Sequence, residues 1–143
     1  ACDTATDEAL WQGIQHQAQL ILCAPCCHHH LQQQLHAVQP MNAIFHDGIL
    51  KHRLGDILTD TFRALILRIL GYRTDVVEFV APEHTDKNLL IRAIRQSQSS
   101  SKNSSAVREY LELKHFWGVT PYLETLLSER LRPYLTEVAP EIH

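Results

Sequence analysis

Three cysteines and three histidines lie within eight consecutive positions of the stretch LILCAPCCHHH, residues 20–30. Thiolate sulfur and imidazole nitrogen are the usual zinc ligands, and Cys23 and Cys26 have the two-residue separation common in zinc sites. A thiol can also act as a nucleophile or a redox group. Because an apolar run comes directly before the cluster, the cluster could instead end a buried strand and line a pocket.

The surrounding sequence favours the pocket wall. Cys23 lies inside the apolar run, where thiols commonly pack as small hydrophobic groups. The chain has no second Cys-x-x-Cys pair, and no Lys or Arg stands near the cysteines in sequence to stabilise a thiolate. We therefore assign no metal ligand, and we expect His29 and His30 to form the solvated start of a helix.

Composition fits one domain that buries a core. The chain has 143 residues, of which 45% are hydrophobic, and no apolar run approaches the ~20 residues that span a membrane. The four cysteines cluster rather than spread as a disulfide framework would, which favours the reducing cytoplasm. Met41 is the only methionine, so we expect the chain to be either a processed product or a piece of a longer protein.

Charge is unevenly distributed. The net charge is −3, residues 1–50 contain no Lys or Arg, and residues 51–108 carry ten Lys and Arg against six Asp and Glu. Any attraction for phosphate should therefore lie in the middle segment. The resulting field is too weak to imply nucleic acid unaided.

Hydrophobic periodicity and turn residues predict alternating helices and strands. Thr4 or Thr6 could cap the first helix, and Gly71 should end the longest one. The two later strands should pair antiparallel. The predicted elements are a helix at 4–18, a strand at 20–24 buried on both faces of a parallel sheet, helices at 27–36 and 49–70, strands at 74–81 and 88–95, and two short helices at 106–118 and 120–131, the second with Pro121 in its first turn.

Several stretches, taken in order, resemble one enzyme family. They are ACDTATDEAL, APCCHHHL, LTDTFRALILRILGYRTDVVEFV, EHTDKNLLIRAIR and FWGVTPYLETLL. In this respect the chain resembles class I S-adenosylmethionine-dependent methyltransferases, in the group that includes the methyltransferase domains of glutathione S-transferase C-terminal domain-containing proteins. Related motifs occur in tRNA 2′-O-methyltransferases that modify position 4 of the acceptor stem.

The resemblance implies an α/β fold, namely the C-terminal half of a Rossmann-like methyltransferase sheet with C-terminal helices. Strands 5, 7 and 6 of that sheet would be present, with strand 7 antiparallel between the other two. Residues 1–96 would form this half-domain, 97–105 a polar linker and 106–143 a helical extension. The Gly-rich loop and the acidic strand end that grip S-adenosylmethionine in such enzymes are absent from this chain, so we expect the fragment alone to be inactive.

The resemblance also places site residues, because ligands of open α/β sheets bind outside the carboxyl ends of the strands. Asp3 would hold an N–H or O–H group of the methyl acceptor, and His28 would take the proton of a hydroxyl acceptor. Asp3 and Thr4 could instead only cap the helix, and Asp7 would interact with its dipole. The expected substrate-binding residues are Cys2, Thr4, Pro25, Cys26, Cys27, Lys87 and Asn88, although the last two could belong to a solvated turn.

Other charged and aromatic residues are assigned structural places. Arg63 and Arg68 lie off the apolar stripe of the long helix and should be surface charges. Arg92 and Arg95 lie in an expected central strand, where each needs a partner or a route to solvent. Phe116, Trp117 and Tyr122 should form the core of the terminal helices.

Three functions remain open at this stage. The chain could be the acceptor side of a cytoplasmic methyltransferase (EC 2.1.1 for the full-length protein) that acts on RNA, a non-catalytic assembly module derived from one, or a small metal-binding module. The expected partner is the missing N-terminal half of the same protein or a second copy that pairs through the edge of the 20–24 strand, with no role for a membrane.

Overall fold

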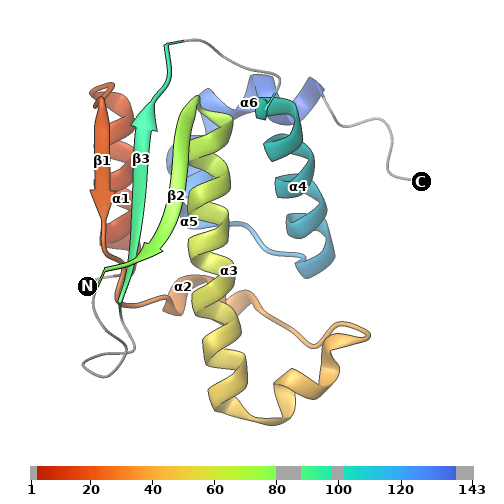
Figure 1. The fold of residues 1–143 in the computed structure, drawn as a ribbon. Helices are drawn as coiled ribbons and strands as arrows, with labels where there is room; N and C mark the ends of the chain where they lie inside the picture. Colours follow the sequence, from red (N-terminus) through yellow and green to blue (C-terminus); the bar gives the residue numbers. More distant parts are fainter. Residues whose placement is uncertain (1–2, 80–87, 98–101, 138–143) are drawn as a thin grey trace.

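A three-stranded sheet packs against a layer of helices in the computed structural model, which describes residues 3–79, 88–97 and 102–137 (Figure 1). The elements in chain order are α1 (Asp3–Gln15), β1 (Leu20–Cys23), α2 (His29–Gln34), the 3-10 helix η1 (Met41–His46), α3 (Gly48–Ile69), β2 (Tyr72–Glu78), β3 (Leu89–Arg95), α4 (Lys102–Trp117), α5 (Tyr122–Leu126) and α6 (Ser128–Glu137).

The strand order is β1-β3-β2, and β3 is antiparallel to both neighbours. Ala93 in the central strand faces Ile21 on one side and Thr74 on the other. The predicted antiparallel pairing of the two later strands is therefore confirmed. Because β1 and β2 run in the same direction, their carboxyl ends lie at the same edge of the sheet, at the bottom of Figure 1.

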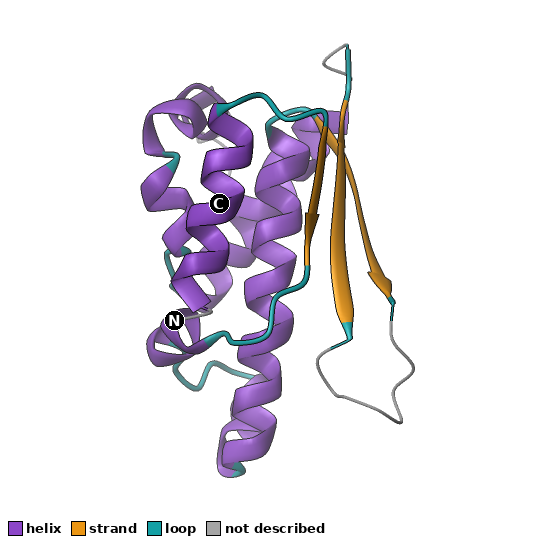
Figure 2. Cartoon of the chain, turned by 90° about the vertical axis from the view of Figure 1, so that its left-hand side faces the viewer, coloured by secondary structure: helices purple, strands orange, loops and turns teal. Residues whose placement is uncertain are grey.

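Helices cover only one face of this sheet within the described ranges, as Figure 2 shows. Ile21 is buried toward α1, whereas Leu20 and Leu22 on the opposite face are 53% and 57% exposed. The prediction that residues 20–24 are buried on both faces is therefore wrong for this chain. The run is apolar on both sides, but only one side has a layer packed on it.

Helix α3 is the centre of the core, and its prediction at 49–70 is confirmed. Its fully buried residues Phe62, Ile66 and Ile69 belong to a cluster that also contains Tyr110 and Leu131 from the C-terminal helices. The C-terminal helices therefore pack into the same hydrophobic core as the sheet and α3. Gly71 ends the helix with φ +90°, a backbone conformation that glycine adopts without strain.

Local predictions differ from the structure in four places. The helix predicted at 27–36 is reduced to His29–Gln34, and the last predicted helix is divided into α5 and α6. Helix α1 already begins at Asp3, so Thr4 and Thr6 lie inside it rather than at its cap. The predicted linker at 97–105 contains the start of α4 at Lys102, while its residues 98–101 fall outside the described ranges.

None of the helices in the described ranges is both long enough and apolar enough to cross a membrane.

Candidate functional site

The candidate site forms where the first turn of α1 and the loop after β1 meet the side of α3. Helix α2 packs closely on α3 at Gly55, where an added Cβ would lie 3.1 Å from Cβ of Gln32. This close approach brings residues 24–30 against α3; they comprise the connection after β1 and the first two residues of α2, and are called the loop 24–30. The first turn of α1 and the loop after β1, which are far apart in sequence, are thereby joined through α3.

Arg63 of α3 is the centre of this junction and is only 1% exposed. Its Nε donates to Asp7 Oδ1 at 2.8 Å, its Nη1 to Asp60 Oδ1 at 3.0 Å and its Nη2 to the Asp3 carbonyl oxygen at 2.9 Å. The prediction that Arg63 is a surface charge is wrong. Its position off the apolar stripe turns it toward α1, where the carboxylate of Asp7, together with that of Asp60 on its own helix, makes its burial acceptable.

His28 continues the network from the other side and is 4% exposed. Its Nε2 forms a hydrogen bond of 3.0 Å with Asp60 Oδ2, and its Nδ1 lies 3.0 Å from Asp56 Oδ1. Asp56 also lies 3.5 Å from Nδ1 of His52. Both ring nitrogens of His28 are thus directed at carboxylates of α3, and the ring fixes the loop to that helix.

Asp3 has two carboxylate oxygens in different surroundings. Oδ2 accepts a hydrogen bond from the backbone N–H of His30 at 2.5 Å, which joins the start of α1 to the start of α2. Oδ1 is buried, and none of the described residues donates to it. A buried carboxylate oxygen without a donor is costly, and a bound N–H or O–H group would satisfy this atom.

A small cavity adjoins this carboxylate. It has a volume of about 10 Å³, and its lining includes Asp3, His30, Arg63, Pro121 and Tyr122. The His30 and Tyr122 rings lie 5.4 Å apart between centroids. The space is about that of one water molecule, so it can admit a single polar atom but no larger group.

Cys23 is the last residue of β1, and Cys26 and Cys27 lie in the loop that follows. All three are half-buried thiols that form no disulfide, and the sulfur atoms of Cys26 and Cys27 are 3.7 Å apart. Burial raises the pKa of the Cys23 thiol above its ordinary value. Over the described part of the chain, no group of three or more His, Cys, Asp or Glu side chains is arranged to hold a metal ion.

The remaining predicted substrate residues are distributed differently. Thr4 is half-buried in the first turn of α1, and Pro25 is buried in the loop. Asn88 is buried just before β3, and its carbonyl accepts the N–H of Phe79, so it extends the pairing of β2 and β3. Cys2 and Lys87 lie outside the described residues.

Electrostatics keep the guanidinium at the centre of the network charged, while burial raises the pKa of its partner Asp7 above the ordinary value. Burial alone would lower the pKa of the Arg63 guanidinium, but hydrogen bonds and charges from Asp7 and Asp60 raise it above its usual value. The guanidinium therefore stays charged across the range in which proteins are handled, and it can hold the carbonyl of Asp3 throughout.

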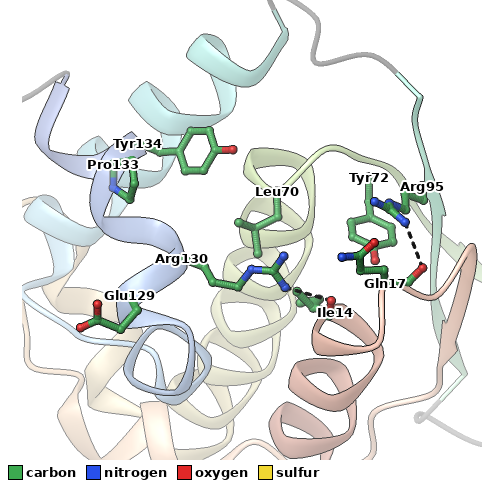
Figure 3. A pocket seen from close by; sticks show the side chains of 9 residues that line it. All are labelled: Ile14, Gln17, Leu70, Tyr72, Arg95, Glu129, Arg130, Pro133 and Tyr134. Carbon is green, nitrogen blue, oxygen red and sulfur yellow. Dashed lines mark hydrogen bonds between the residues drawn. The ribbon is translucent and has the colours of Figure 1, made fainter.

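Arginines also line a second cavity, of about 280 Å³, at the opposite end of the sheet (Figure 3). Arg130 Nη1 donates to the Ile14 carbonyl at 2.9 Å, Arg95 donates to the Gln17 carbonyl at 3.3 Å, and the Tyr72 hydroxyl donates to the Ala18 carbonyl at 3.1 Å. The Ile14 carbonyl belongs to the last turn of α1, whereas those of Gln17 and Ala18 lie just after the helix. Arg130 therefore caps the helix, and Arg95 holds the turn that follows it.

Other sequence expectations for charged and aromatic residues are met in part. Arg92 forms an exposed cross-strand pair with Asp75 at 2.9 Å. Trp117 is buried in the core, as expected, whereas Phe116 is exposed. Tyr122 lines the small cavity of the site rather than only the core.

Sequence reasoning missed Arg63, Asp60, Asp56 and Tyr122 as residues of the site. One signal could have found part of the set. Asp56, Asp60 and Arg63 are spaced by four and three residues, which puts them on one face of a helix. A charged row inside the most apolar helix of a chain needs buried partners, and those partners come from α1 and from the loop.

Comparison with known families gives one match. Residues 1–34 match the model of a family described as a methyltransferase domain. The matched region contains α1, β1 and α2, and therefore both Asp3 and the loop 24–30. The match supports a methyltransferase domain as the origin of this site. No curated protein and no solved structure matches the chain.

Proposed function

We propose that this chain forms the acceptor side of an S-adenosylmethionine-dependent methyltransferase and that its acceptor is RNA. The family match over residues 1–34 supports the enzyme class. The RNA substrate draws support from the resemblance to tRNA methyltransferases and from the excess of Lys and Arg in residues 51–108. Three free thiols in the loop and strand favour the reducing cytoplasm.

One observation carries the proposal, namely the buried Oδ1 of Asp3 to which no described residue donates. A carboxylate at this position can orient a single N–H or O–H group of the acceptor. Holding a reacting group in the correct geometry contributes up to roughly 7–11 kcal/mol in well-oriented systems. The adjoining cavity has room for that one atom, so the rest of an RNA acceptor would lie outside it.

The cofactor itself does not fit the described residues. The cavity beside Asp3 is about 10 Å³, and the sequence has no Gly-rich loop after a strand to hold a nucleotide. We therefore assign S-adenosylmethionine to polypeptide outside this chain and derive no step of the reaction through it.

The other predicted site residues form the wall of the proposed acceptor site. Thr4, Pro25, Cys26 and Cys27 come from the two stretches that meet at Asp3, and we retain Cys2, Lys87 and Asn88 as substrate contacts in the proposal. His28 is directed at Asp56 and Asp60, so we assign it to holding the loop in place rather than to receiving a substrate proton.

Transfer of a labelled methyl group tests the proposal. The longer protein that includes this chain is incubated with tritiated S-adenosylmethionine and total RNA, and the label is followed into nuclease-sensitive material. We expect incorporation into RNA that depends on the protein. Incorporation that resists nuclease but not protease would contradict an RNA acceptor, and an absence of cofactor binding by calorimetry would contradict the enzyme class.

The exposed face of the sheet supports a partner and a second candidate function. Strand β1 is an edge strand of the described sheet, and Leu20 and Leu22 project from the uncovered face beside the site. An apolar edge of this kind is normally covered. We propose that the polypeptide carrying the cofactor site covers it. A non-catalytic assembly module would use the same face without binding the cofactor.

Sedimentation of the isolated 143-residue chain tests the partner. The chain alone should self-associate at micromolar concentration through the β1 edge, and addition of the cofactor-binding portion should replace the self-complex with a heterocomplex. A chain that stays monomeric and does not bind the added portion would contradict the proposed partner. Assembly without any affinity for S-adenosylmethionine would favour the non-catalytic module.

A further inference from the structure

Arg63 contacts the first turn of α1 directly, and it reaches the loop 24–30 through the carboxylate that Asp60 shares with His28. Its Nη2 donates to the Asp3 carbonyl and, at 3.2 Å, to Asp7 Oδ2, so one nitrogen of the guanidinium holds two groups of α1. The five N–H groups of arginine are fixed in one plane, so these contacts set the orientation of the first turn of α1 relative to α3.

Asp60 transmits this arrangement to the loop 24–30. One of its oxygens accepts from Arg63 and the other lies 3.0 Å from Nε2 of His28. The same loop ends at His30, whose N–H bonds to the Asp3 carboxylate. The path from Asp3 through Arg63, Asp60 and His28 to His30 is therefore closed into a ring of contacts around the candidate acceptor oxygen.

Stability alone does not explain a buried network of this size. Removing charges from water is expensive, and well-packed hydrophobic residues of similar volume often stabilise a core as well as a buried ion pair or better. Hydrophobic residues cannot, however, hold a backbone carbonyl and an imidazole ring at defined distances. What the network adds to this core is orientation of the residues around Asp3.

We infer that Arg63 and Asp60 are positioning residues of the proposed acceptor site, which they organise by tying the first turn of α1 and the loop 24–30 to one face of α3. The inference rests on the proposed function for the meaning of the site. The geometry it predicts can be measured in this chain without any substrate.

Amide resonances from two-dimensional ¹H–¹⁵N NMR provide the test. The amide proton of His30 should appear strongly downfield because it donates to a carboxylate. Two variants are compared with the wild type, namely Arg63→Lys, which keeps the charge but loses the planar fork, and the triple change Arg63→Met, Asp7→Leu, Asp60→Leu, which replaces the ions with apolar groups. Arg68→Lys is the matched control, because Arg68 lies on the same helix but bonds the Thr74 carbonyl away from the site.

We expect the triple variant to fold with a thermal midpoint within a few degrees of the wild type, while the His30 amide loses its downfield shift and the resonances of residues 24–30 move or broaden. Arg63→Lys should show the same loss at His30, and Arg68→Lys should leave both regions unchanged. Wild-type His30 and loop resonances in the folded triple variant would overturn the inference. Failure of the triple variant to fold would also overturn it, because the network would then serve the fold.

The same variants in the longer protein separate this inference from the proposed function. If the variants lose the downfield shift of His30 but the wild type transfers no methyl group, the contacts of the network are supported and the proposed enzyme class is contradicted. If Arg63→Lys transfers methyl groups with an unchanged acceptor KM and kcat, the enzyme class is supported and the positioning role is contradicted.

Discussion

At the scale of single residues, the carboxylates around α3 are not equivalent. Asp7 and Asp60 bond to Arg63, and Asp56 and Asp60 face His28. Asp3 alone among these four keeps a buried oxygen that no described residue contacts with a donor. Ligand chemistry is therefore expected at Asp3, whereas the other three carboxylates are engaged with Arg63 and His28.

Cys23 provides a prediction about the thiols. Burial raises the pKa of this thiol above its ordinary value, so the reactive thiolate is only a small fraction of the Cys23 population at neutral pH. Iodoacetamide should therefore label Cys23 slowly at pH 7–8, and the rate should rise only in strongly alkaline buffer. Mass spectrometry of the digested protein measures the label at each cysteine.

Cys23→Ser controls the assignment of that label. The variant should lose only the slow alkaline phase, because Cys26 and Cys27 lie separately in the loop. Rapid labelling of Cys23 in the folded protein at neutral pH would contradict the burial argument and would favour a reactive thiol.

At the scale of elements, the boundary between α3 and β2 depends on Gly71. The residue has φ +90°, and its N–H bonds the Arg68 carbonyl at the helix end. A side chain in this left-handed region costs roughly 1–2 kcal/mol. Gly71→Ala should therefore lower the free energy of unfolding by about that amount, as measured by urea denaturation.

Gly48→Ala is the matched control for this change. Gly48 begins α3, and an added Cβ would meet no atom within 4 Å. Alanine is the better helix former, so this change should be neutral or stabilising by up to about 1 kcal/mol. Equal destabilisation by both substitutions would show that the backbone angle at Gly71 is not the cause.

The elements also show how far sequence alone leads. Helix α3 was predictable because its apolar positions keep helical spacing for about six turns and a glycine follows. The short α2 was overestimated, because its length is decided by contacts with Gly55 and α3 that no local pattern encodes. Arg63 was misplaced for the same reason, since its partners Asp7 and Asp3 are more than fifty residues away in sequence.

The candidate site was predictable only in outline. The juxtaposition of Asp3 with the loop 24–30 followed from the resemblance, and the structure places them in contact through the His30 amide. The direction of His28 toward α3 did not follow, because a histidine after a strand gives no sign of which element its ring will face.

At the scale of the whole molecule, the uncovered sheet face is the feature with the largest consequence. Leu22 is 57% exposed and lies opposite Arg92 in the register of β1 and β3. Leu22→Lys adds a charge to this face without removing a buried contact. We expect the variant to keep the stability of the isolated chain and to lose its self-association in sedimentation.

One other substitution makes that result specific. Ile57 on α3 is also exposed, at 63%, but it lies away from the sheet, so Ile57→Lys should leave association unchanged. Loss of association in both variants would indicate nonspecific contacts, and persistence of association in Leu22→Lys would show that the β1 face is not the interface.

The most direct test of the central claim is methyl transfer by the longer protein carrying Asp3→Asn. Asparagine keeps a carbonyl oxygen for the His30 amide and replaces the other oxygen with an NH₂ group. That hydrogen-bond donor would repel the N–H or O–H group of the methyl acceptor. With tritiated S-adenosylmethionine, we expect the transfer rate to fall by about 100-fold or more while cofactor affinity in calorimetry stays unchanged. The exposed Asp75→Asn should leave both quantities unchanged. An unaltered rate in Asp3→Asn, or an equal loss of rate and cofactor affinity, would contradict the placement of Asp3 on the acceptor side.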